Sequence, residues 1–362
     1  MSAKAIIFTF CLLVFVFFGS SKSEARVSGI CSDCHTMHNS QGGSLVSSSV
    51  NPYLLNDDCV GCHTGTNTAG GKIPKVYDPT GPVYGNNTLA GGNFYWVLQD
   101  ATKGHNCLSI PGMSADPNLN DAPGHHGPGS PVNCSVCHSW NVYPPGASGD
   151  CASCHSRISS CESCHKPAHH ADDSATVVGE SGGWYRFLVS SNHPDSLLGV
   201  KGIEDPDWEF TVSPSDHNEY NGCANADGRP DNSISHFCGG CHGYFHGTHN
   251  SADGNGQSPW LRHPSSIPLP SSGEYALYNT QDGVTVGPYN PLAPVARNPA
   301  TLSGMSGPTS VVTPGSDQVM CLSCHRAHGS PYPDMLRWDY SSCSSGVANS
   351  QCGCFVCHTT KD

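Results

Sequence analysis

A short motif of cysteine and histidine recurs through the chain. In eight places, two cysteines separated by two residues are followed at once by a histidine. The cysteine pairs are Cys31/Cys34, Cys59/Cys62, Cys134/Cys137, Cys151/Cys154, Cys161/Cys164, Cys238/Cys241, Cys321/Cys324 and Cys354/Cys357, and the histidines are His35, His63, His138, His155, His165, His242, His325 and His358. Two thiols at this spacing can bond to the two vinyl groups of a porphyrin, and the next imidazole can bind its iron. The motif therefore predicts eight covalently attached c-type haems, each with one proximal histidine.

Zinc binding and disulfide bonding are the other common uses of paired cysteines. A structural zinc site combines two such pairs at regular spacing and needs no histidine directly after each one. Disulfides are the usual fate of cysteines in exported proteins. Because a histidine follows all eight pairs, the pattern favours haem attachment over both alternatives.

The second axial position of each iron needs a ligand if the iron is to be closed. Thirteen of the 21 histidines lie outside the motifs, whereas the chain has only six methionines. His125 and His170 neighbour two of the best candidates, and His217, His236 and His249 rank lower. We expect the distal ligands to be His38, His105, His126, His169, His193, His246, His263 and His328.

Several of these candidates closely follow a motif. His38 and His328 lie three residues after a proximal histidine, and His169 and His246 lie four after one. Residues three or four apart on a helical turn share one side. Such a histidine does not reach the far face of its own haem, so we expect it to bind the next haem. The spacing thus predicts a stacked chain of haems.

The remaining sequence is poor in signals for regular structure. Hydrophobic residues make up 36% of the 362 residues, and there are 41 glycines and 28 prolines. This composition interrupts helices and strands and leaves little apolar surface for an ordinary core, which flat apolar haems can replace. We expect a mostly irregular fold with short helices and few strands, wrapped around eight stacked haems. Residues 26–362 show no boundary and are expected to form one domain.

The first 25 residues resemble an export signal. Lys4 precedes an apolar run at residues 5–19, and small residues at 23–25 fit a signal peptidase site. The run is shorter than the roughly 20 residues of a membrane span. We expect cleavage after Ala25 and a secreted, extracellular or cell-surface protein without a transmembrane span, with the periplasm as an alternative. The first and last motifs then lie near the chain ends, which predicts terminal haems near the surface.

Four further cysteines lie outside the signal and the motifs. They are Cys107, Cys223, Cys343 and Cys352. An oxidising compartment favours two disulfides, such as Cys343–Cys352 and Cys107–Cys223, although three pairings are possible. Cys352 also precedes Cys357 by five residues, but the usual spacing favours Cys354 as the attachment residue.

The formal net charge of −13 makes anionic partners unfavourable. The sequence has no phosphate-binding glycine loop, no nucleophile elbow and no basic patch for nucleic acid. Nucleic acid is therefore not expected as a partner, whereas metal cations or basic redox proteins are electrostatically favoured.

Several sequence blocks resemble the OmcS-type outer-surface multihaem cytochromes of metal-reducing bacteria. The matching blocks are Cys-Ser-Asp-Cys-His-Thr-Met-His-Asn-Ser at 31–40, Gly-His-Asn at 104–106, Arg-His-Pro at 262–264, Cys-Leu-Ser-Cys-His-Arg-Ala-His at 321–328 and the closing Cys-His-x-x-Lys-Asp. The resemblance implies stacked bis-histidine haems in an extracellular filament. It also implies that His38 binds a haem of the adjoining subunit, and that His105, His263 and His328 are distal ligands. The chain departs from the family in having eight motifs instead of six, with the extra pair at 134–165.

Together these features predict an electron-transfer protein instead of an enzyme. We expect a homopolymer that takes electrons from upstream periplasmic or outer-membrane cytochromes to an extracellular metal or another acceptor. One alternative is an octahaem reductase of a small nitrogen or sulfur oxyanion, which needs an iron with an open or lysine-ligated position. No motif ends in lysine, which counts against it. The other alternative is a monomeric periplasmic electron shuttle.

Overall fold

The computed structural model describes residues 27, 29–68, 73–81, 89–119, 122–123, 158–189, 199–224, 231–242 and 263–361. The expected signal peptide, 1–25, lies outside these ranges. So do the third and fourth motifs, with Cys134, Cys137, His138, Cys151, Cys154 and His155. The same holds for five further histidines, His125, His126, His193, His246 and His249. The assignments made for these residues stay predictions.

Regular structure in the described ranges is sparse. The longest helix there, α6, has six residues (Ile234–Gly239). The other α-helices are α2 (Cys31–Cys34), α3 (Cys59–Cys62), α4 (Tyr95–Gln99), α7 (Pro299–Ser303) and α8 (Gly353–Cys357). Single 3-10 turns are η1 (Pro52–Leu54), η2 (Ala101–Lys103), η4 (Cys161–Ser163), η5 (Glu180–Gly182), η6 (Tyr185–Phe187), η8 (Glu274–Leu277), η9 (Cys321–Ser323), η10 (Pro333–Met335) and η11 (Tyr340–Ser342). The prediction of a mostly irregular fold with short helices and few strands is confirmed.

Five very short strands form one sheet in the order β3-β4-β6-β7-β5. They are β3 (Gly202–Ile203), β4 (Glu219–Asn221), β5 (Ile267–Pro268), β6 (Ala296–Arg297) and β7 (Gln318–Val319). All neighbouring strands are antiparallel except β4 and β6, which run parallel with Tyr220 opposite Ala296. Cys321 begins the seventh motif two residues after β7, so this sheet fixes where that motif starts.

A buried ionic cluster joins the central strands. Arg297 on β6 donates from Nε to Glu219 Oε2 on β4 at 2.6 Å, and from Nη1 to Asp317 Oδ2 at 2.8 Å. Nη2 also donates to Glu219 Oε1 at 3.0 Å, and the two remaining N–H groups donate to the backbone oxygens of Val311 and Thr309. All three charged side chains are at most 2% exposed. The cluster takes the place of apolar packing at the centre of the sheet.

In the described part of the chain, three small hydrophobic clusters take the place of one large core. One surrounds Tyr278 and includes Val356 of α8, and a second contains Tyr220 and Met320. The third contains Phe94 and packs against Val60 and Cys161. Each cluster therefore packs against a residue within or directly beside a Cys-x-x-Cys-His motif. Apolar side chains are used mainly to fix the motifs in space.

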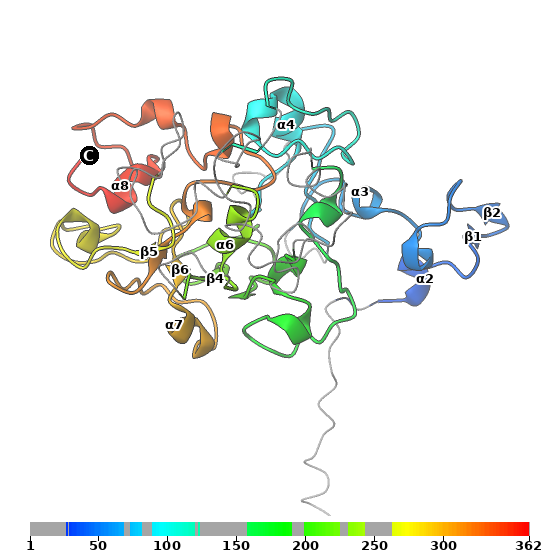
Figure 1. The fold of residues 1–362 in the computed structure, drawn as a ribbon, viewed down its shortest axis with the longest axis horizontal. Helices are drawn as coiled ribbons and strands as arrows, with labels where there is room; N and C mark the ends of the chain where they lie inside the picture. Colours follow the sequence, from blue (N-terminus) through cyan, green and yellow to red (C-terminus); the bar gives the residue numbers. More distant parts are fainter. Residues whose placement is uncertain are drawn as a thin grey trace, which may run out of the picture.

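The N-terminal part projects from the rest of the molecule as an arm, here defined as residues 29–57. It carries α2, η1 and a hairpin of β1 (Ser40–Gln41) and β2 (Ser44–Leu45), and it lies at the far right of Figure 1, opposite the C-terminus. Its exposed apolar side chains are Ile30, Met37, Leu45, Val50 and Tyr53, each at least 65% exposed. None of the helices among the described residues has the length and apolar character needed to cross a membrane.

Candidate functional site

Each described motif closes one tight turn that ends at its histidine. The histidine N–H donates to the carbonyl of the first cysteine at 2.8–3.1 Å in all six, namely His35, His63, His165, His242, His325 and His358. This short turn groups two thiols and one imidazole without any support from a longer helix. The local geometry suits a flat ligand that is attached at two edges and bound by the imidazole.

The cysteines of the six described motifs are not consumed by disulfides. This leaves their sulfurs for the thioether bonds that the motif predicts, and bonding to haem at each of them stays a prediction. These residues are Cys31, Cys34, Cys59, Cys62, Cys161, Cys164, Cys238, Cys241, Cys321, Cys324, Cys354 and Cys357.

Cys241, the second cysteine of the sixth motif, has a different local structure from its counterparts in the first two motifs. The helices α2 and α3 include Cys34 and Cys62, whereas α6 ends at Gly239 and leaves Cys241 in a turn beyond the helix. Its N–H still donates to Cys238 O at 3.2 Å. The neighbouring Cys321 and burial raise the pKa of the Cys238 thiol, and Cys241 adds to this shift. The predicted role of Cys241 in haem attachment therefore relies on a turn closed by the motif itself instead of on a helix.

The imidazole of each described motif is held through Nδ1. In five motifs the acceptor is a backbone carbonyl: Tyr53 for His35 (3.1 Å), Pro74 for His63 (2.7 Å), Arg186 for His165 (2.8 Å), Pro123 for His242 (2.7 Å) and Asp334 for His325 (2.8 Å). In the eighth motif, His358 Nδ1 lies 3.5 Å from the Glu274 carboxylate. Since these oxygens only accept, Nδ1 carries the hydrogen and the Nε2 lone pair is left for a metal. Metal-binding histidines are generally oriented in this way.

Three motifs share one larger supporting structure, which we call the carbonyl clip. It pairs the first, fifth and seventh motifs with residues 52–55, 185–188 and 333–336. In each clip the second residue supplies the carbonyl for Nδ1, and the residue after the motif histidine donates to the third, at 2.7–2.8 Å. The second and third residues all have φ between 49° and 58°: Tyr53, Leu54, Arg186, Phe187, Asp334 and Met335.

This backbone conformation is unfavourable for residues other than glycine, at about 1–2 kcal/mol each. Its recurrence in three separate clips indicates that it serves the orientation of the histidine. The clips were missed in the sequence because nothing at 53, 186 or 334 marks a backbone acceptor. The three clips do share a four-residue sequence pattern, which is Pro or Tyr, any residue, a large apolar residue and Leu. This pattern could have identified them.

Four pairs of histidines lie at a spacing that suits one metal ion. The distances between ring centres are 6.0 Å for His35 and His170, 6.1 Å for His105 and His242, 6.0 Å for His165 and His328, and 6.3 Å for His263 and His358. Two imidazoles bonded to opposite sides of one metal, at roughly 2 Å each, have ring centres about 6 Å apart. Each pair joins one motif histidine to one histidine from elsewhere in the chain.

These pairs bear on the expected distal ligands. His105, His263 and His328 each lie opposite a motif histidine. Beside the fifth motif it is His170 that faces His35, whereas His169 packs edge-on against Phe187 at 5.4 Å. The assignment of His169 as a distal ligand thus stays a prediction. The neighbouring His170 occupies the position that a distal ligand needs. The described ring pairs include neither His63 nor His325.

Burial keeps several of these imidazoles neutral. Withdrawal from solvent lowers the pKa of His105 to about 4 and that of His328 to about 3, and nearby histidines add to both shifts. Burial also lowers the pKa of His165, His242 and His325. A neutral imidazole has the free lone pair that a metal needs, so these groups are ready to bind one at physiological pH.

The buried His217 has a different environment from these histidines. His217 is fully buried, with Nδ1 3.1 Å from the Ser213 carbonyl and Nε2 3.2 Å from Glu219 Oε1. Its ring stacks on Tyr289 at 3.6 Å between ring centres. Both nitrogens are engaged within the protein, so His217 acts as part of the ionic cluster at the sheet.

His105 and His328 are brought together by two segments that are far apart in sequence. Residues 326–330 cross residues 89–105 through a ladder of backbone bonds, including His328 N to Gly91 O at 2.6 Å and Asn93 N to Gly329 O at 2.9 Å. His105 Nδ1 contacts Ala327 O at 2.6 Å. Glycine is needed at this crossing, because a Cβ on Gly92 would lie 1.9 Å from Gly329 O.

Replacing Gly92 by alanine is expected to lower the free energy of unfolding by about 3 kcal/mol, since it adds a backbone clash to an unfavourable φ of +86°. Gly112→Ala is the matched control. Gly112 has a similar φ of +81°, but the nearest atom to an added Cβ is 3.7 Å away, so about 1 kcal/mol is expected. Guanidinium unfolding of both variants measures the difference, and equal losses would contradict a role for close packing at the crossing.

Two cationic side chains beside the seventh motif have no anionic partner among the described residues. Arg337 is 6% exposed, and its Nε has no hydrogen-bond partner in that part of the chain. Burial and the nearby Arg337 lower the pKa of Arg326 to about 9. Neighbouring cations in a buried environment favour an anion between or beside them. The carboxylates of a haem have the charge that this position needs.

The cysteines of different motifs also come together. Val60 of the second motif packs in one cluster with Cys161 of the fifth, and Cys321 N of the seventh donates to Ser235 Oγ on α6, the helix that contains Cys238. Cys107 and Cys59 lower the pKa of the Cys161 thiol, and Cys238 lowers that of Cys321. The second and fifth motifs are therefore neighbours, and so are the sixth and seventh. Groups attached to these pairs of sulfurs must lie side by side.

The cysteines outside the motifs follow only one of the expected pairings. Cys343 and Cys352 form a disulfide, as expected. The Cys107–Cys223 pairing is wrong, because neither residue is in a disulfide. Cys107 is packed in the cluster beside Cys161, whereas Cys223 lies against Ser233 near the sheet at 3.1 Å. The positions of Cys107 and Cys223 in the sequence do not indicate which part of the structure each cysteine packs in.

Comparison with known proteins supports the resemblance seen in the sequence. Residues 313–362, which contain the last two motifs, match a family model described as "Doubled CXXCH motif". The C-type cytochrome OmcS of Geobacter sulfurreducens is 28% identical over 356 residues, covering 85% of this chain and 78% of the relative. A solved structure, the Outer Membrane Cytochrome S Filament from Geobacter sulfurreducens, matches with a TM-score of 0.47 and 23% identity, covering 90% of this chain and 87% of the other. The motifs and the similarity to a c-type cytochrome indicate c-type haem as the cofactor.

Proposed function

We propose that this protein is an octahaem c-type cytochrome that carries electrons over long distances outside the cell, along haems closed by two histidines and as a polymer. When bound, each haem supplies an iron that gains and loses one electron at a time. The observation that carries the proposal is the set of four histidine pairs at ring-centre distances of 6.0–6.3 Å. A closed iron has no site for a substrate, which favours conduction over catalysis.

The chain's own residues would hold the histidine ligands of the described motifs in fixed orientations. The carbonyl clips and the other Nδ1 acceptors orient Nε2 of the motif histidines. A fixed orientation means that little rearrangement accompanies a change of charge. Fast exchange between neighbouring haems depends on this rigidity.

Histidines that follow one motif pair with the histidine of another. His328, after the seventh motif, lies opposite His165 of the fifth. His170, after the fifth motif, lies opposite His35 of the first. Each such histidine would therefore tie two haems together, and the series runs from the seventh motif through the fifth to the first. This relay supports a continuous row of haems.

The contacts between motifs suggest an order for that row. The first motif is linked to the fifth through His170, the second and fifth share adjacent cysteines, and so do the sixth and seventh. The seventh and eighth are also close: burial raises the pKa of the Cys324 thiol and of the Cys357 thiol, and the nearby Cys354 adds to the first shift and Cys324 to the second. We propose that the row of haems begins at the first motif, on the N-terminal arm. The second and fifth motifs follow, then the sixth and seventh, and the eighth motif lies on the C-terminal side (Figure 1).

His38 would continue the series into another subunit. It follows the first motif as His328 follows the seventh, and it is exposed on the projecting arm. Asn39 orders the turn after it by donating from Nδ2 to Ser47 O at 2.9 Å. The exposed apolar side chains of the arm would be covered by the same contact. We therefore propose that His38 closes a haem of the adjoining subunit.

Replacing His170 by glutamine tests the proposed pairs. One iron should lose its sixth ligand, because glutamine does not replace imidazole at haem. We expect a high-spin ferric signal in low-temperature electron paramagnetic resonance that is absent from the unmodified protein. The matched control is His169→Gln. It should leave every iron low-spin, because we propose that His170 is the ligand in place of the expected His169.

The reverse result, with a high-spin signal only in His169→Gln, would contradict the pairing of His35 with His170 and restore the expectation from sequence. A high-spin signal from intact filaments of the unmodified protein would instead favour the octahaem reductase. Discrete particles with only low-spin irons would favour the monomeric shuttle.

A further inference from the structure

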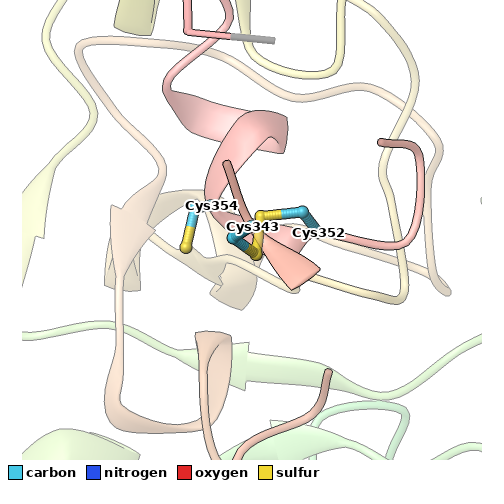
Figure 2. Close-up of side chains that lie close together, drawn as sticks. All are labelled: Cys343, Cys352 and Cys354. Carbon is cyan, nitrogen blue, oxygen red and sulfur yellow. A yellow bond between two sulfur atoms is a disulfide. The ribbon is translucent and has the colours of Figure 1, made fainter. Parts of the chain in front are cut away.

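The last motif has a spare cysteine next to its attachment residues. Cys354 and Cys357 have the usual spacing before His358, but Cys352 stands only two residues before Cys354. The sulfur atoms of Cys343, Cys352 and Cys354 all lie within 4.8 Å of one another. Figure 2 shows the disulfide between Cys343 and Cys352 with the sulfur of Cys354 beside it.

This cluster does not suit a metal ion. Metal binding needs thiolates, and two of the three sulfurs are bonded to each other. Only Cys354 keeps a free thiol. The disulfide therefore decides which sulfur of the cluster can react.

The surrounding structure holds Cys352 and Cys354 on either side of one fixed residue. Gly353 has no room for a side chain, because a Cβ there would lie 2.3 Å from the ring of the buried Trp338. Cys352 N donates to Asn349 O at 3.0 Å, and Asn349 Nδ2 donates to Ser342 O at 3.0 Å. These bonds order the loop that brings Cys343 to Cys352.

We propose that the Cys343–Cys352 disulfide directs haem attachment at the last motif by withdrawing Cys352 from the reaction. The inference rests on the proposed function, since it assumes that this motif binds haem. In attachment, the cysteine sulfur bonds to one vinyl carbon, the thiol hydrogen goes to the other, and no group leaves. A vinyl group that reaches Cys354 is also within reach of Cys352, because their sulfurs are at most 4.8 Å apart. A sulfur in a disulfide has no thiol hydrogen and does not add.

The order of events follows from this chemistry. Cys343 and Cys352 each lose a hydrogen as the S–S bond forms, and the two electrons and two protons pass to a protein disulfide oxidant of the exporting compartment. The disulfide then precedes attachment, and Cys354 and Cys357 remain as the two thiols for the vinyl groups. The device is needed here because Cys352 and Cys357 would otherwise form a second, longer-spaced attachment pair.

Replacing Cys343 by serine frees Cys352 and tests the proposal. The purified protein is alkylated and digested, and fragmentation mass spectrometry of the haem peptide locates the thioether sulfurs. We expect attachment only at Cys354 and Cys357 in the unmodified protein. In the variant, this uniform attachment should be lost, with a second population attached at Cys352 and Cys357. Attachment at Cys354 and Cys357 alone, with Cys352 alkylated, would overturn the proposal.

The double variant Cys343→Ser/Cys352→Ser separates competition from loop stability. It lacks both the disulfide and the competing thiol, so uniform attachment at Cys354 and Cys357 should return. If the double variant misattaches haem as the single variant does, loop stability is responsible and the proposal is wrong. Absence of haem from every motif of the unmodified protein would refute the proposed function instead, so the two failures are distinguishable.

Discussion

Replacing His38 by alanine is expected to leave folded subunits with every haem attached, but to abolish polymerisation and to leave one iron of each subunit high-spin. His38 is exposed on the projecting arm. It lies three residues after the histidine of its motif, as does His328, which pairs with His165 of another motif within the subunit. Loss of its imidazole would leave an iron of the adjoining subunit without its sixth ligand. Negative-stain electron microscopy and size-exclusion chromatography measure the outcome.

Methionine at the same position is the matched variant. A methionine thioether can also bind haem iron, so His38→Met should restore part of the assembly and raise the reduction potential of one haem. Filaments of normal length from His38→Ala would contradict the bridging role. The contact would then depend on the apolar side chains of the arm alone.

Replacing Arg297 by alanine is expected to lower the free energy of unfolding by about 3–5 kcal/mol. The change leaves the carboxylates of Glu219 and Asp317 buried and without their cation. The same cluster sets the position of β7 and hence of the seventh motif. Guanidinium unfolding of the haem-loaded protein, followed by circular dichroism, measures the loss.

An exposed ion pair is the control for this prediction. Lys361 Nζ lies 3.5 Å from Glu274 Oε2, and its side chain is 51% exposed. Lys361→Ala should leave the unfolding midpoint unchanged, because solvent screens such pairs. If Arg297→Ala lowered stability by less than about 1 kcal/mol, the buried cluster would not be what stabilises the sheet.

The irregular fold could be predicted from the glycine and proline content. The proximal histidines and attachment cysteines follow from five-residue motifs and stay predictions. The Cys343–Cys352 disulfide also closes only a short loop. In these cases the relevant groups are near one another in sequence, so few alternative arrangements exist.

Features that depend on distant segments could not be predicted. The crossing of residues 326–330 over 89–105 orients His105 through a carbonyl 222 residues away. The choice between His169 and His170 depends on which ring faces His35 after folding. The carbonyl clips use backbone atoms, which leave almost no mark on residue type. The partner of Arg297 likewise becomes clear only when β4 and β6 lie side by side.

The most direct test of the account is a high-resolution cryo-electron microscopy map of the haem-loaded protein purified from the cells that make it. We predict one iron between the Nε2 atoms of each of four pairs: His35 with His170, His105 with His242, His165 with His328, and His263 with His358. We also predict a continuous row of haems that passes into the next subunit at His38. A map in which any of these four irons has an open position, or a different sixth ligand, would contradict these predictions.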